Sequence, residues 1–166
     1  LTQAEIDAVV ADVPGGAEEI RDIYPLAPLQ EGILFHHLLQ TEGDAYLLRS
    51  VLAFDSRQRL DGFVDALQQV VDRHDVLRTS VHWVGLGQPV QVVHRRAAVP
   101  FTELEPSDDP HGQLLRATDP QRTRLDVTRA PLLSVAAVQA DGGWLLAVVN
   151  HHLISDHLTV DAVLEE

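Results

Sequence analysis

An uninterrupted apolar stretch near the C-terminus constrains the fold of this 166-residue chain more than any other feature. Residues 144–149 read Trp-Leu-Leu-Ala-Val-Val, a composition typical of a strand that is buried on both faces. The run follows Asp141-Gly142-Gly143, a hairpin signal, and another apolar run occupies 132–139 before that turn. The sequence therefore predicts a hairpin of two strands, the second of which is buried.

Helical and strand signals alternate along the rest of the chain. A capping box at Thr2 and Glu5, a proline at position 28 and a capping Asp55 or Ser56 mark predicted helix starts. The predicted helices cover 2–13, 28–40, 56–74 and 112–118, with another starting near His157, and the predicted strands cover 46–54, 79–84, 88–94, 101–105, 132–139 and 144–152. Strands interleaved with helices predict an α/β or α+β fold with a mixed sheet flanked by helices.

Composition limits the class of protein. A hydrophobic content of 45% over this length predicts one compact domain or lobe. With no bilayer-length apolar run and no secretory signal, we expect a cytoplasmic protein without a membrane partner. The absence of Cys excludes disulfides, thiolate metal sites and a cysteine nucleophile, and a net charge of -13 argues against nucleic acid as a partner. Because the chain also has no Met, we expect it to be a piece of a larger polypeptide.

Polar groups follow directly on the buried strand. His151 and His152 end the strand, and Asp156 follows four residues later. Neighbouring side chains of a strand point to opposite faces, so only one of the two imidazoles can serve a given reacting centre. An imidazole can exchange a proton near neutral pH, which makes this position a candidate for proton chemistry.

Four segments together resemble a known family. His151-His152-x-x-x-Asp156 resembles the HHxxxD(G) signature of the condensation domains of nonribosomal peptide synthetases. Three stretches agree with that family in the expected order: 24–32 (Tyr-Pro-Leu-Ala-Pro-Leu-Gln-Glu-Gly), 73–79 (Arg-His-Asp-Val-Leu-Arg-Thr) and 125–132 (Leu-Asp-Val-Thr-Arg-Ala-Pro-Leu). The resemblance begins at Ile20 and covers only the first of the family's two lobes.

The resemblance implies a lobe similar to chloramphenicol acetyltransferase. Residues 20–166 would form the N-terminal lobe of a condensation domain, the C-terminal lobe would be absent, and 1–19 would be a linker or leader helix from an upstream carrier domain. The implied activity in secondary-metabolite biosynthesis is peptide bond formation by acyl transfer, which the isolated lobe should not perform. Implied partners are upstream and downstream peptidyl carrier domains and an adenylation domain of the same polypeptide. The domain would bind no cofactor of its own, because phosphopantetheine on the carriers holds the substrates.

The resemblance also assigns roles to residues. His152 would face the tunnel as a base or as a group that positions the amine, and His151 would point away and pack. Asp156 would pair with Arg78 and hold the loop, whereas Arg73 and His74 would only close the long helix. His157 stands where the family usually has Gly, which would affect access to the tunnel. We expect His36 and His37 to be structural or surface residues, because nothing complementary lies nearby in sequence.

Other functions stay open at this point. The chain could be a noncatalytic module of the same superfamily that docks a carrier or recruits another enzyme, or an epimerization, ester-forming or coenzyme A-dependent member. The residues His151, His152, Asp156 and His157 could also form a metal cluster, but only if they were helical, whereas the preceding run predicts a strand. No Gly-x-Ser-x-Gly motif supports a serine hydrolase.

Overall fold

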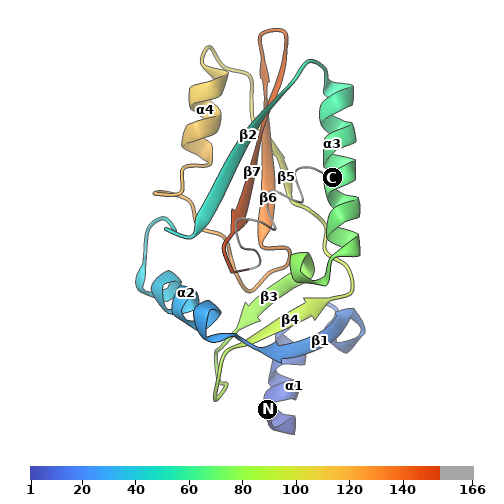
Figure 1. Ribbon diagram of the computed structural model, residues 1–166, viewed down its shortest axis with the longest axis vertical. Coiled ribbons are helices and arrows are strands. Elements are labelled where there is room, and N and C mark those ends of the chain that lie inside the picture. The colour runs from blue at the N-terminus through green and yellow to red at the C-terminus, as the bar shows by residue number, and fades with distance from the viewer. Residues whose placement is uncertain (154–166) are drawn as a thin grey trace.

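A four-stranded mixed sheet forms the centre of the molecule (Figure 1). The computed structural model describes residues 1–153, so Asp156, His157 and the helix expected near His157 lie outside the described residues. The strand order is β2 (Leu47–Phe54), β7 (Gly143–His151), β6 (Leu133–Ala140) and β5 (Phe101–Glu103). The β5–β6 pair is parallel and the other two pairs are antiparallel. This confirms the mixed sheet and the β6–β7 hairpin, in which Gly142 takes the positive φ of +76° that the turn requires.

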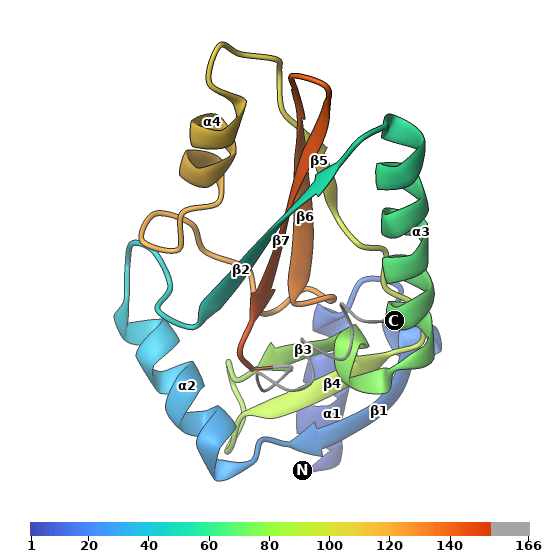
Figure 2. The same cartoon turned by 45° about the horizontal axis from the view of Figure 1, so that its top comes forward.

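Helices cover both faces of this sheet, as Figures 1 and 2 show. Helix α3 (Arg57–Arg73) packs on the face that carries Leu146 and Val148, whereas α4 (Pro110–Ala117) packs through Leu114 on the face that carries Ala147. Consecutive β7 residues thus alternate between two hydrophobic layers. A strand with helices on both sides has no solvent-facing side, which explains the absence of polar alternation in its sequence.

A second, three-stranded antiparallel sheet lies beside the first, with the order β1 (Ile20–Pro25), β4 (Val90–His94) and β3 (Thr79–His82). The sequence did not predict β1, because an edge strand with no buried residue carries no apolar pattern. The predicted strand at 101–105 is confirmed over Phe101–Glu103, and it pairs with β6 at the edge of the four-stranded sheet.

The remaining helices begin where their capping residues predict. Thr2 caps α1 (Gln3–Asp12), whose Val9 packs with Val90 and Val92 under the three-stranded sheet. Pro28 occupies the first turn of α2 (Pro28–Leu39), and Ser56 caps α3. Within residues 1–153 no helix is both long and apolar enough to cross a bilayer.

Candidate active site

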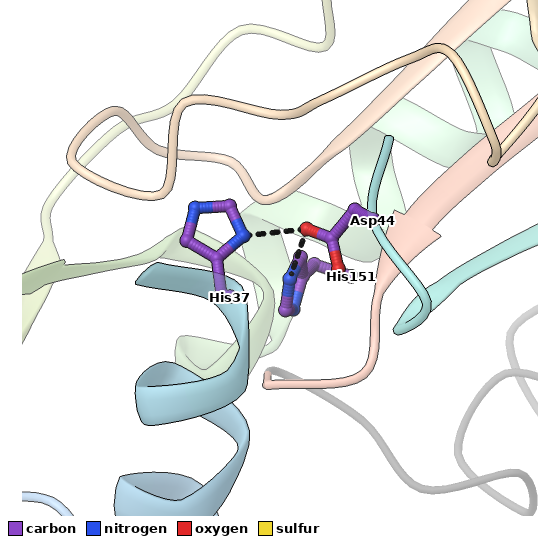
Figure 3. A group of neighbouring side chains, drawn as sticks. All are labelled: His37, Asp44 and His151. Atoms are coloured by element: carbon purple, nitrogen blue, oxygen red, sulfur yellow. Dashed lines mark hydrogen bonds and ion pairs between the residues drawn. The ribbon is translucent and has the colours of Figure 1, made fainter. Parts of the chain in front are cut away.

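Three buried side chains from different elements meet at the C-terminal end of β7 (Figure 3). His151 is the last residue of β7 and is fully buried, and its Nε2 lies 2.8 Å from Oδ2 of Asp44. His37 on α2 places its Nδ1 2.6 Å from the same oxygen. A single carboxylate therefore joins α2, the loop that follows it and the central strand of the sheet.

The hydrogen-bond partners determine which ring nitrogen of each histidine carries its proton. The backbone N–H of Leu153 donates to Nδ1 of His151 over 3.1 Å, so the ring proton must lie on Nε2, which donates to Asp44. Arg124 Nη2 lies 3.1 Å from Nε2 of His37, and a guanidinium can only donate. His37 consequently carries its proton on Nδ1, and it also donates to Asp44.

The environment keeps Asp44 ionised. Burial by itself would raise the pKa of this carboxyl, but hydrogen bonds from His151 and His37 and from the backbone N–H of Tyr46 outweigh burial and hold the pKa well below its ordinary value. The Tyr46 amide donates to the second oxygen, Oδ1, over 3.0 Å. Both carboxylate oxygens thus accept hydrogen bonds, which offset the cost of burying the charge.

His37, Asp44 and His151 are also the residue types that hold a metal ion, and their ligand atoms lie within 4.8 Å of one another. Their geometry does not fit one. Ligands around a tetrahedral zinc ion stand about 3.3 Å apart, given metal–ligand distances near 2.0 Å, whereas the two nitrogens here lie 2.6 and 2.8 Å from the oxygen. The other nitrogen of each ring accepts a hydrogen bond, whereas a metal-bound imidazole carries a proton on that nitrogen and donates it. The cluster is therefore a hydrogen-bond network.

The same argument applies to the metal cluster considered from the sequence. That cluster needs His151 to be helical, but His151 is the last residue of strand β7. Both of its ring nitrogens are also engaged in hydrogen bonds. Two of its other members, Asp156 and His157, lie outside the described residues.

His152, the next residue, has a different environment. Its side chain is partly exposed, and its backbone N–H donates to the carbonyl of Tyr46 over 2.9 Å. The ring centroids of His152 and Tyr46 lie 6.5 Å apart. The ring of Tyr46 also lies 6.2 Å from that of His36, an exposed residue of α2 next to the buried His37. Of the two adjacent imidazoles at the strand end, the structure locks His151 in the interior and leaves His152 accessible.

Arg78, the residue that the resemblance pairs with Asp156, is buried. It ends a 3-10 helix (Asp75–Arg78), and its guanidinium donates to the carbonyl oxygens of His94, Val71 and Asp72 over 2.7 to 3.0 Å and to the carboxylate of Asp75. The expected pairing of Arg78 with Asp156 remains a prediction, because Asp156 lies outside the described residues. Arg73 and His74 close α3, as expected.

Sequence reasoning missed most of this network. It placed His37 correctly among the structural or surface residues, but its statement that nothing complementary lies nearby is wrong, since Asp44 follows only seven residues later. A turn containing Gly43 and Asp44 directly after the helix was the available signal. Nothing in the sequence indicated Arg124, whose contact with His37 spans 87 residues.

A second buried polar cluster connects α1 with the three-stranded sheet. Ser80 Oγ lies 2.9 Å from Nε2 of His82 and 2.7 Å from Nε2 of His94, and Nδ1 of His82 lies 2.9 Å from Oδ2 of Asp12. The order Ser-His-Asp matches that of a hydrolase triad, but Ser80 is fully buried and no substrate carbonyl could reach it. A pocket of about 390 Å³ adjoins His82 and Asp12 and is separate from the network at His151.

Comparison with known proteins identifies the family. A sequence profile described as "Condensation domain" matches residues 20–166. The chain belongs to the condensation-domain family. This condensation-domain chain is 48% identical over its whole length to malpinin synthetase of Mortierella alpina, of which it spans 2%. It is also 32% identical, over 84% of its length, to tyrocidine synthase 2 of Brevibacillus parabrevis, of which it spans 4%.

A solved structure agrees with the fold. The starter condensation domain of rhizomide synthetase matches 86% of this chain with a TM-score of 0.68 and 21% sequence identity, and the matched part is 35% of that chain. The prediction of an α/β fold with a mixed sheet flanked by helices is confirmed, and this fold matches that of a condensation domain. The chain spans a small fraction of the curated synthetases that it matches and about a third of the solved domain.

Proposed function

We propose that this condensation-domain chain takes part in amide bond formation between two carrier-bound substrates. The amine of the acceptor attacks the thioester carbonyl carbon of the donor acyl or peptidyl group, the carbon–sulfur bond breaks, and the donor carrier's thiol leaves with a proton. Such a reaction needs a group that positions the amine or receives its proton, together with close approach of two tethered substrates. We assign the first role to His152.

One observation carries this proposal. The two imidazoles of the HHxxxD motif have opposite environments: His151 is fully buried with both ring nitrogens bonded, whereas His152 is partly exposed. A proton-transfer group must reach its substrate, and only His152 can do so. His151 supports it from the interior. The pairing of Asp156 with Arg78 and an influence of His157 on substrate access belong to the same proposal.

The proposal includes the rest of the domain and its partners. Residues 20–166 would form the first lobe, a second lobe would complete the substrate tunnel, and 1–19 would link to an upstream carrier domain. Upstream and downstream carriers would deliver substrates on phosphopantetheine, and an adenylation domain of the same polypeptide would load an amino acid. The chain's 35% share of the rhizomide starter domain supports this division.

Product formation by a polypeptide that carries both lobes and both carriers tests the proposal. His152→Ala should lower the rate of amide formation by about 100-fold or more, the usual contribution of a positioned acid–base group. The exposed His111 on α4 offers a matched control, and His111→Ala should retain the full rate. Mass spectrometry of the product also separates an amide from an ester, and chiral analysis detects epimerization.

Two results would overturn the assignment. Full product formation by His152→Ala would remove this residue from the chemistry. An unsubstituted polypeptide that binds loaded carriers but releases no product would identify the chain as a docking or recruitment module.

A further inference from the structure

We propose that Asp44, held by His37 and Arg124, is the positioning residue for His152. The inference rests on the proposed function of His152, but the network that supports it stands on the geometry alone. None of these three residues belongs to the HHxxxD motif, and they come from α2 and two loops that lie far apart in the sequence.

The backbone on both sides of His152 is connected to the same carboxylate. The His152 N–H donates to the Tyr46 carbonyl, and the Tyr46 N–H donates to Oδ1 of Asp44. On the other side, the Leu153 N–H donates to Nδ1 of His151, whose Nε2 donates to Oδ2 of Asp44. Each branch ends on a different oxygen of one buried side chain. The two peptide units that set the direction of the His152 side chain are thus fixed together.

Asp44 is itself held from outside. Its own backbone N–H donates to the carbonyl of Pro120 over 2.7 Å. Arg124 donates to the carbonyl oxygens of Gly43 and His37, each over 2.8 Å, and to the His37 ring. The loop before β2, the end of α2 and the loop at 120–124 therefore act as one unit around the carboxylate.

An amide in place of the carboxylate cannot keep this pattern. Asp44 accepts N–H groups at both oxygens, and Leu153 and Arg124 prevent His151 and His37 from moving their protons to the other ring nitrogen. An asparagine at this position can be placed in two orientations. Its NH₂ group would face either the Tyr46 N–H or the ring N–H groups of His37 and His151, and two donors cannot bond to each other. Asp44→Asn should release one branch to His152 with almost no change of side-chain volume.

The test combines kinetics with amide hydrogen exchange. In the two-lobed polypeptide, Asp44→Asn should lower kcat per folded molecule by about tenfold or more while KM changes by less than about twofold, because a misdirected catalytic group impairs chemistry more than binding. In the 166-residue chain, NMR should show faster exchange of the Leu153 or His152 amide, by about tenfold, and unchanged exchange of the amides in the middle of β7. Glu42→Gln makes the same chemical change at an exposed position of the same loop and should alter neither.

Arg124→Lys provides a second variant if Asp44→Asn does not fold. It leaves the carboxylate in place, removes the forked contact with His37, and should lower kcat by about threefold without changing KM. An unchanged kcat in the folded variants would overturn the inference. So would equal acceleration of exchange along all of β7, which would indicate a loss of core stability only. If the unsubstituted polypeptide makes no product, the proposed function fails, and the exchange data alone decide whether Asp44 fixes the His152 backbone.

Discussion

Replacing Arg78 by lysine should destabilise the protein although the charge is conserved. Arg78 is 2% exposed. Its guanidinium uses three nitrogens to reach acceptors on two sides: the end of α3 with the 3-10 helix after it, and the carbonyl of His94 in β4. A lysine ammonium is a single nitrogen on a flexible stem and cannot reach both sides at once.

The magnitude follows from the hydrogen bonds that lysine cannot make. A hydrogen bond to a charged group contributes about 1.5–3 kcal/mol, and an abandoned buried acceptor adds a desolvation cost. The Asp75 carboxylate is 52% exposed, so water screens its ion pair with Arg78 and its share is small. Because one or two of the carbonyl acceptors would be left without a donor, Arg78→Lys should lower the free energy of unfolding by about 2–4 kcal/mol.

Urea denaturation followed by circular dichroism measures this difference. The matched control is Arg59→Lys, because Arg59 is 73% exposed and its ion pair with Asp55 lies on the surface; that variant should stay within about 0.5 kcal/mol of the parent. A decrease of less than about 1 kcal/mol in Arg78→Lys, or an equal decrease in the control, would refute the argument that guanidinium geometry is what matters here.

Three further predictions concern the fold. Gly43→Ala should lower the free energy of unfolding, measured by urea denaturation, by about 2 kcal/mol or more, because Gly43 has a φ of +70° and a Cβ would lie 2.4 Å from a backbone oxygen. The control Gly62→Ala lies in an open position of α3 and should be neutral or stabilise by up to about 1 kcal/mol. Leu146→Ala should lower the free energy of unfolding, again measured by urea denaturation, by about 2–5 kcal/mol, because Leu146 is fully buried. Leu29 is 74% exposed, so Leu29→Ala should lower it by less than about 0.5 kcal/mol. Burial, reinforced by a neighbouring imidazole, lowers the pKa of His94 from its ordinary 6.5, so it contributes stability that is present above pH 6.5 and is lost as the pH falls toward the lower folded value. The urea concentration at the midpoint of unfolding should therefore decrease as the pH is lowered below 6.5. His94→Gln should reduce this decrease, and the same pH dependence in the parent and the variant would contradict the prediction.

Local signals in the sequence identified most of the elements. The alternating helix and strand patterns, the caps at Thr2 and Ser56 and the hairpin at Gly142 all specify conformation within a few residues, and the structure follows them. The buried run at 144–149 was recognisable because helices on both faces leave no position for polar side chains. The edge strand β1 was not, because among the described strands it pairs with β4 alone and none of its residues is fully buried.

The candidate site divides in the same way. The alternation of a strand predicted that only one of the two adjacent imidazoles could serve a given reacting centre, and the family resemblance assigned that part to His152. The structure buries His151 and leaves His152 partly exposed. The partner that holds His151 could not be inferred from the sequence, because Asp44 stands 107 residues before it and carries no motif.

Most of the helices and strands, the fold class and the residues of the HHxxxD motif could be recognised from the chain alone, since each depends on neighbours a few positions away. The division of the strands into two sheets and the convergence of distant groups on Asp44 became visible only in the folded molecule. A buried carboxylate is stable only where hydrogen-bond donors surround it, and the packing of separate elements is what brings those donors together.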